Sequence, residues 1–143
     1  MIERIYRGQS VDGVWHEGFL ARSPGVKQNR PGEGWYISAA DEKPYAHLVK
    51  PMSVGMSTGL QDENGQTVFE GDIIEIDAPV PEKKILTVKF GIYFENSRKR
   101  LGFYAKWADN YVWPNDLVTA IQFGKVIGNL IDTPEKEQKY EVD

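Results

Sequence analysis

A run of strict alternation between residues 86 and 95 constrains this chain more than any other feature of its sequence. Every second position is apolar, and these positions are Leu86, Val88, Phe90, Ile92 and Phe94. The residues between them are mostly polar. A period of two places successive side chains on opposite faces of an extended strand. The segment is therefore predicted to be a long β-strand with one apolar face.

A second alternating segment follows at once. Phe103, Ala105 and Trp107 alternate with Tyr104 and Lys106, which predicts the returning strand of a hairpin. Between the two strands, Ser97-Arg98-Lys99-Arg100 is predicted to form a basic turn.

Turn signals divide the remaining chain into short strands. Asp12-Gly13 is a hairpin dipeptide between Ile5 and Leu20, and Asn64-Gly65 is predicted to form a type I′ hairpin turn. Gly71 is predicted to mark a bulge or tight bend between two strands. An edge strand is expected between Pro44 and Pro51, and a final strand over residues 125–131.

Two segments do not show a clear strand pattern. The stretch Ser23–Gly34 holds several Pro and Gly residues and is predicted to be a long loop. Asn115-Asp116 could cap a short helix through Ile121, but Val118 and Thr119 favour a strand. Both alternatives remain open for residues 115–123.

These patterns predict a mainly β protein with at most one short helix. The segment from Phe69 to Ile131 is expected to form a small twisted β-barrel, with an SH3-like arrangement as one candidate. An N-terminal β unit is expected to pack against it. We predict one domain over residues 1–143, with β lobes at 1–57 and 58–134 and a polar tail at 135–143.

Composition narrows the chemistry. The chain has no cysteine, which excludes a disulfide scaffold, thiolate nucleophiles and cysteine-bound metals. No apolar run approaches the ~18 residues of a membrane span. The N-terminus lacks the apolar run of a signal peptide, so a cytoplasmic location is expected.

Charge is distributed unevenly along the chain. The net charge is −4, yet residues 78–113 carry seven basic and three acidic side chains, and residues 58–77 carry six acidic and no basic ones. Such patches are ordinary on a solvated surface, and they can also pair between subunits or meet a charged partner.

Three stretches of the sequence carry a family resemblance. The first is Tyr6-Arg7-Gly8 with residues 15–20, and the last is residues 126–129 with Pro134-Glu135. The most characteristic stretch consists of residues 58–65 and 69–74. Together they resemble the YopX-like proteins of bacteriophages and prophages. The resemblance implies a phage or prophage origin, a cytoplasmic β-rich protein in a bacterial host or phage-infected cell, and self-assembly, and it implies no activity.

The residues that carry this resemblance are predicted to be structural. They are Thr58, Gly59, Leu60, Asp62, Asn64, Gly65, Phe69, Glu70, Gly71, Asp72, Ile127, Gly128 and Asn129. The loop 23–34 and the stretch 96–113 depart from the family pattern, so any specificity they hold does not carry over.

Catalytic and metal-binding patterns are weak. Glu70 and Asp72 would share a face if extended and could serve acid–base or cation chemistry, but Asp62 and Asp72 also suit turns that need a backbone acceptor. His16 and His47 lack the spacing of a metal motif and are interpreted as ordinary strand residues. We predict no catalytic residue, no metal and no cofactor.

A basic and aromatic surface is the one candidate binding site. If the two long strands pair, Lys83 and Lys84 are also expected to approach the basic turn. The predicted site residues are Lys89, Tyr93, Arg98, Lys99, Arg100, Tyr104 and Lys106. Cations among aromatic rings are typical of single-stranded nucleic-acid binding, where charges meet phosphates and rings stack on bases.

Three functions follow from these observations. The first is a non-enzymatic phage accessory protein that binds an unidentified protein partner and self-associates. The second is a nucleic-acid-binding module that uses the basic hairpin. The third is a small metal-dependent hydrolase that uses Glu70 and Asp72.

Overall fold

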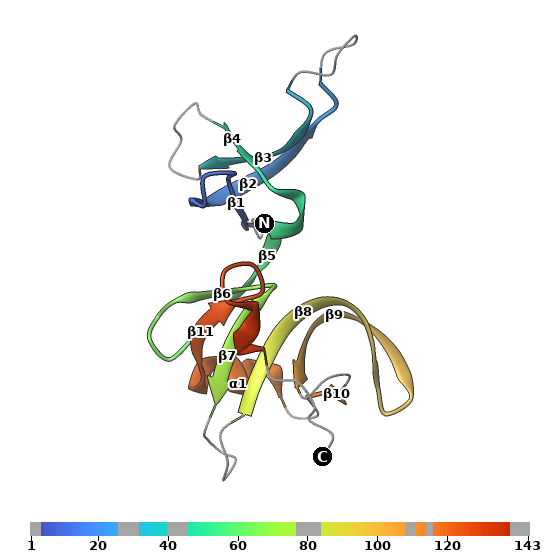
Figure 1. The fold of residues 1–143 in the computed structure, drawn as a ribbon. Helices are drawn as coiled ribbons and strands as arrows, with labels where there is room; N and C mark the ends of the chain where they lie inside the picture. Colours follow the sequence, from blue (N-terminus) through green and yellow to red (C-terminus); the bar gives the residue numbers. More distant parts are fainter. Residues whose placement is uncertain are drawn as a thin grey trace. The chain divides into compact units, whose positions relative to one another are not determined.

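The computed structural model describes residues 4–25, 32–39, 46–76, 84–107, 111–113 and 116–137. The chain divides into two compact units, Met1–Ser57 and Thr58–Asp143 (Figure 1). The single domain predicted over residues 1–143 stays a prediction.

The first unit is an antiparallel sheet. Its strands are β1 Tyr6–Gln9, β2 Trp15–Ser23, β3 Gly34–Ala39 and β4 Ala46–Val49, in the spatial order β4-β3-β2-β1. The first residues of β5 (Gly55–Gln61) pair with the free side of β1, where Arg7 faces Gly55. A short 3₁₀ helix, Pro51–Ser53, precedes β5.

Local turn chemistry explains the β1–β2 hairpin. Gly13 adopts φ +86, a conformation that glycine takes at little cost, and Ser10 N donates to Val14 O at 2.9 Å. The hairpin predicted around Asp12-Gly13 is confirmed. The predicted edge strand before Pro51 is also confirmed, as β4, while Pro44 and residues 26–31 of the predicted long loop lie outside the described residues.

The second unit is built on a five-stranded antiparallel sheet of order β10-β9-β8-β7-β11. Its strands are β7 Asp72–Ile76, β8 Lys84–Glu95, β9 Arg98–Trp107, β10 Tyr111–Val112 and β11 Lys125–Asn129. Here the last residues of β5 form a hairpin with β6 (Thr67–Phe69), and a 3₁₀ helix covers Pro134–Lys136. The bend predicted at Gly71, which has φ +92, is confirmed between β6 and β7.

The core of this unit lies between the sheet and the one helix, α1 (Leu117–Phe123). Ile74, Leu86 and Val88 are fully buried and contribute sheet side chains, while α1 contributes Ala120 and Ile121. The alternation of the sequence is thus explained over the first half of β8, where every second residue enters the core.

The helical alternative for residues 115–123 is the correct one. Asp116 caps the helix: its Oδ1 accepts from Val118 N at 3.1 Å, and its Oδ2 accepts from Thr119 Oγ1 at 2.9 Å. The cap offsets the β-propensity of Val118 and Thr119. Within the described ranges, a search for an apolar helix of membrane-spanning length finds none.

The mainly β class with one short helix is confirmed, but the predicted closed barrel is wrong. Closure would require the sheet edges β10 and β11 to pair, and the described residues leave both as edges. The chain between them forms α1 instead, and this helix fills the space over the sheet with Ala120 and Ile121.

Candidate functional site

The β8–β9 hairpin carries the predicted binding residues, and its turn differs from the prediction. Glu95 faces Arg98, so the turn consists of Asn96 and Ser97 alone, and both have positive φ (51 and 66). This is the type I′ geometry that matches the twist of a hairpin. The predicted basic turn is therefore wrong, because Arg98 to Arg100 already belong to β9.

The register sorts the hairpin residues into two faces. Residues directly opposite each other in an antiparallel pair project on the same side. Lys89 faces Tyr104, and Tyr93 faces Arg100. We call this side the cationic face; the predicted site residues on it are Lys89, Tyr93, Arg98, Arg100, Tyr104 and Lys106, and Glu95 also projects there, opposite Arg98.

One predicted residue does not join that set. Lys99 faces Phe94 across the hairpin and projects on the opposite side. We call this second side the apolar face, and its apolar members are Phe90, Ile92, Phe94, Leu101 and Phe103. Lys84 is also remote from the turn, since its Nζ lies 5.0 Å from the centre of the Trp107 ring, and Lys83 lies outside the described residues.

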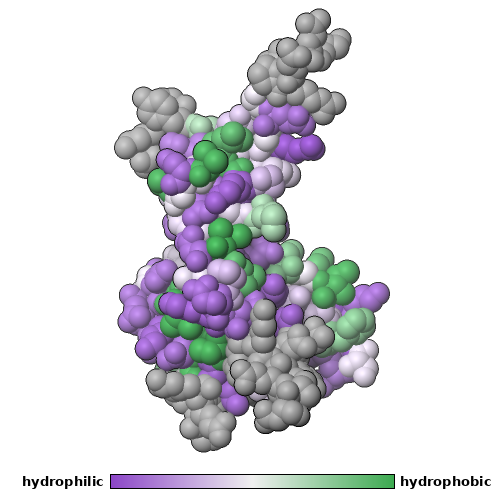
Figure 2. Space-filling view, in the orientation of Figure 1, coloured by the Kyte–Doolittle hydropathy of each residue, from purple (hydrophilic) through white to green (hydrophobic). Residues whose placement is uncertain are grey.

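The apolar face leaves the core as the hairpin extends. Val88 and Ala105 are buried, but Ile92, Phe94 and Leu101 are 62%, 63% and 73% exposed. Figure 2 shows hydrophobic side chains at the surface over this curve of the hairpin. Exposed apolar groups in such a row are typical of an interaction site rather than of a solvated strand.

A stacked pair of tyrosines organises the cationic face. The Tyr93 and Tyr104 ring centres are 5.0 Å apart, with an angle of 28° between the planes. Between these two levels of the hairpin, Gly91 faces Gly102 and offers no side chain. The rings can therefore meet across the gap that the glycines leave.

The four cations of this face are available to a partner. Within the part of the chain that the structure describes, Lys89, Arg98, Arg100 and Lys106 form no ion pair. Both arginines are exposed, and both lysines are half-buried. Ion pairs with the described residues therefore do not neutralise the local excess of positive charge, and Glu95, opposite Arg98, is the one carboxylate that the register places on this face.

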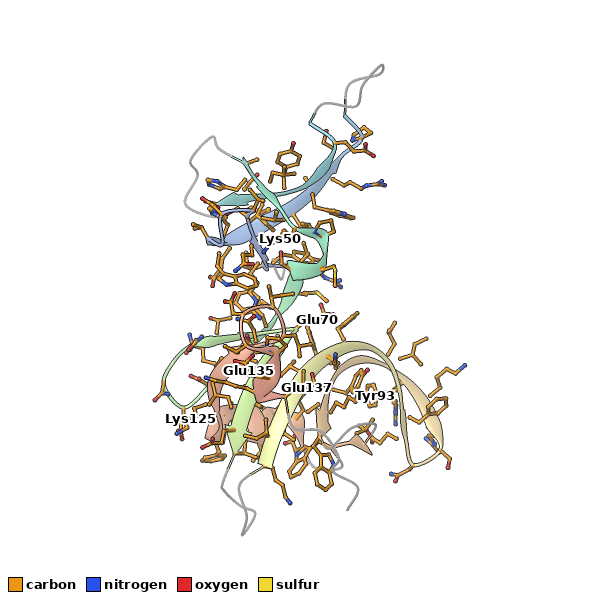
Figure 3. All side chains as sticks on the ribbon, in the orientation of Figure 1. Lys50, Glu70, Tyr93, Lys125, Glu135 and Glu137 are labelled. Atoms are coloured by element: carbon orange, nitrogen blue, oxygen red, sulfur yellow. The ribbon has the colours of Figure 1, made fainter. Side chains whose placement is uncertain are left out.

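A hollow of about 510 Å³ lies beside the same hairpin. Its lining includes Tyr93, Tyr104 and Glu95 from the hairpin, with Trp113 and Asp116 from the segment that follows. Figure 3 shows Tyr93 within the curve that β8 and β9 make. Trp113 is 8% exposed, and its Nε1 has no hydrogen-bond partner among the described residues.

Polar side chains of the most characteristic family-like segment, residues 58–65 with 69–74, form hydrogen bonds with backbone groups. Asp62 is buried: its Oδ1 accepts from Asn64 N and Gln66 N, and its Oδ2 accepts from Val126 N, all at 2.9 Å. The predicted hairpin exists, but the type I′ turn is wrong because only Gly65 has positive φ. The carboxylate stabilises a different turn by accepting its amides.

Other residues of that segment also have structural roles, either in hydrogen bonds with the backbone or in the core. Thr58 Oγ1 donates to Val68 O at 2.7 Å, and Asp72 Oδ2 accepts from Phe69 N at 2.8 Å. Gly59 has φ +77, Leu60 packs against the core, and Phe69 is buried.

The closing segment is also explained by local contacts. A Cβ at Gly128 would lie 2.0 Å from Thr133 Oγ1, so only glycine leaves room for that side chain. Asn129 Oδ1 accepts from Ile131 N and Asp132 N, which fixes the turn after β11. Ile127 is half-buried in β11.

Glu70 and Asp72 do not form the extended pair that a hydrolase would use. Gly71 lies between them at φ +92, so the alternation expected of a strand fails there. Asp72 is fully buried and Glu70 is half-buried. Among the described residues, no group of three or more His, Asp or Glu side chains could hold a metal ion.

The two histidines form a contact that the sequence analysis missed. Their rings stack with centres 3.8 Å apart and planes 11° apart. Burial and, second, the charge of His47 lower the pKa of His16, while Asp12 opposes this shift. The charged form of His16 is thus disfavoured in the first unit.

Trp113 is the other residue that sequence reasoning missed. It follows β10, a strand of two residues, and its position depends on Trp113 N donating to Ala105 O at 2.8 Å. Its ring packs edge-on against Trp107. The only signal in the sequence was that Trp113 precedes Pro114, and this position does not predict the backbone hydrogen bond from Trp113 N to Ala105 O.

The fold and the site define a small, mainly β protein with an exposed two-faced hairpin. A family model described as YopX protein matches residues 24–136, which is more than half of the chain. The chain therefore belongs to the YopX protein family. A comparison with curated proteins finds no match.

Proposed function

We propose that this chain is a phage or prophage accessory protein without enzymatic activity, which works by self-associating and binding other proteins. The observation that carries the proposal is the exposed apolar face of the β8–β9 hairpin. The phage setting rests on the family resemblance, and self-association rests on the hairpin.

A second copy of this chain is the partner that suits the apolar face. Two copies related by a two-fold axis would present the same patch to each other, as in most homodimers. Lys99 is the one charged side chain that the register places among the exposed apolar residues, so few like charges would be opposed. If two copies met through their cationic faces instead, the arginines and lysines of one copy would face those of the other, and this like-charge repulsion is unfavourable.

Two lysine substitutions test this proposal. Ile92→Lys with Leu101→Lys would place two charges where apolar side chains are 62% and 73% exposed in the isolated chain. Burying each of the native side chains contributes up to about 1.5–3 kcal/mol, so the double variant should weaken association by about 100-fold or more. Size-exclusion chromatography with light scattering at several protein concentrations measures the effect.

The matched control is Val11→Lys with Met52→Lys. These residues are 90% and 89% exposed but belong to the first unit, away from the hairpin in sequence. The control should associate like the unmodified chain. A monomeric unmodified chain at high concentration, or equal association by both double variants, would contradict self-association through the apolar face.

A further inference from the structure

We propose that the cationic face of the β8–β9 hairpin binds single-stranded nucleic acid, with phosphates along its cations and bases against Tyr93, Tyr104 and the adjoining hollow. The cations and tyrosines of this site lie opposite the apolar face proposed for self-association, while Phe94 and Phe103 of the apolar face also line the hollow. Substitutions of the cations and substitutions of Ile92 and Leu101 therefore test the two proposals separately.

Charge provides the first argument. Lys89, Lys106, Arg98 and Arg100 share one face and form no ion pair with the described residues. Arg98 lies directly opposite Glu95, and Glu95 is six residues along β8 from Lys89. The row from Lys89 to Arg98 therefore extends over roughly 20 Å at about 3.3 Å per residue. A row of this length suits a few consecutive phosphates, at the short end of known single-strand sites.

The tyrosine pair provides the second argument. Tyr93 faces Arg100 and Tyr104 faces Lys89, so each ring has a cation beside it. The centres of the two rings are 5.0 Å apart, and the rings lie on the same face of the hairpin as the four cations. Base–aromatic stacking of about 1–3 kcal/mol per base is the usual complement to such cations.

The hollow provides the third argument, and it indicates that bases rather than phosphates enter. Glu95 and Asp116 line it, and their carboxylates would repel a phosphate. Trp113 lines it as well, with a buried N–H that has no acceptor among the described residues. A base in the hollow would lie against the Trp113 side chain, and the exposed Glu95 carboxylate could accept from its exocyclic amino group.

These features favour a single strand over a duplex. In a duplex the base faces are covered by their neighbours, so neither the tyrosines nor the hollow could reach them. Unpaired bases expose both faces and edges. An acidic peptide would satisfy the cations but would leave the stacking surface of the two tyrosines unused.

Two adjacent charge reversals test the proposal with a matched control. Arg100→Glu changes the cationic face, whereas Lys99→Glu makes the same charge change one residue away on the apolar face. The probe is a fluorescein-labelled oligothymidylate, followed by fluorescence anisotropy at several salt concentrations. Arg100→Glu should weaken binding by about tenfold or more at low salt, and Lys99→Glu should have a much smaller effect.

Salt and stacking can be separated in the same assay. With four cations on phosphates, the slope of log K against log salt should be no steeper than about −3. Tyr93→Leu should weaken binding without changing that slope, and Tyr93→Phe should retain binding because its ring remains.

Three results would overturn the proposal. They are no binding of the oligothymidylate at low salt, equal losses in Arg100→Glu and Lys99→Glu, or equally good competition by oligoglutamate of the same charge. The last result would assign the cationic face to acidic proteins. Light scattering on Arg100→Glu shows whether self-association is intact, so the two proposals are judged independently.

Discussion

Replacing Asp62 with alanine is expected to lower the free energy of unfolding of the second unit by about 4 kcal/mol, which is much of the stability of a small domain. The buried carboxylate accepts three backbone amides at 2.9 Å, from Asn64, Gln66 and Val126. Each such bond to a charged acceptor contributes about 1.5–3 kcal/mol. Water can replace part of this at the exposed turn amides, but less readily at half-buried Val126.

Urea unfolding followed by circular dichroism measures this loss. Glu63→Ala is the matched control, because Glu63 is adjacent and exposed. It should change the free energy of unfolding by no more than about 0.5 kcal/mol. Asp62→Asn should fall between the two, because it keeps an acceptor oxygen and loses the charge. An Asp62→Ala variant as stable as Glu63→Ala would show that the carboxylate does not hold the turn.

Replacing Gly18 with alanine is expected to disrupt the first unit to a similar degree. A Cβ at this position would lie 1.8 Å from Ser38 O and 2.7 Å from Ser38 C in the neighbouring strand. Backbone atoms cannot turn aside as a flexible side chain can, so β2 and β3 must separate locally. We expect a loss of about 3 kcal/mol, at the upper end of overpacking effects.

Hydrogen exchange of peptides from β2 and β3 localises this effect. Gly13→Ala is the control, since a Cβ there has nothing within 4 Å and only the positive φ opposes it. That variant should lose about 1–2 kcal/mol. Equal protection of β2 and β3 in the Gly18→Ala variant and the unmodified chain would contradict the close approach at Ser38.

Local patterns in the sequence predicted most of the strands. The alternation from Leu86 to Phe94 became the central part of β8, and the turn dipeptides at Gly13 and Gly65 both lie in hairpins. These features depend on neighbouring residues, so the sequence is sufficient to detect them. Barrel closure depends on whether distant edges meet, which no local pattern encodes.

The position of Lys99 illustrates the same limit at the candidate site. The sequence indicated a basic cluster but not the turn that precedes it. Because the turn has two residues, Asn96 and Ser97, the parity of β9 places Arg98 and Arg100 on one face and Lys99 on the other. A turn with one more residue would have reversed this assignment.

Contacts between distant residues account for what was missed. The amide of Val126 that reaches Asp62 is 64 residues away in the chain. The hollow likewise combines hairpin residues with Trp113 and Asp116, and neither was assigned to a binding site by spacing alone.

Both proposals depend on the face assignment of the β8–β9 hairpin, and a pair of cysteines tests it in a chain that has none. The Ala105 carbonyl accepts from Trp113 N, so the backbone groups of Ala105 point away from β8. Backbone direction alternates along a strand, so the backbone groups of Leu101, four residues earlier, point the same way. Leu101 and Ile92 are therefore directly opposite each other as a non-hydrogen-bonded pair. Such a pair has the Cα separation that a disulfide requires. After mild oxidation, intact mass should show that monomeric Ile92→Cys with Leu101→Cys has lost two hydrogens, while Ile92→Cys with Arg100→Cys has not. Preferential oxidation of the second pair would place Arg100 on the apolar face and contradict the account.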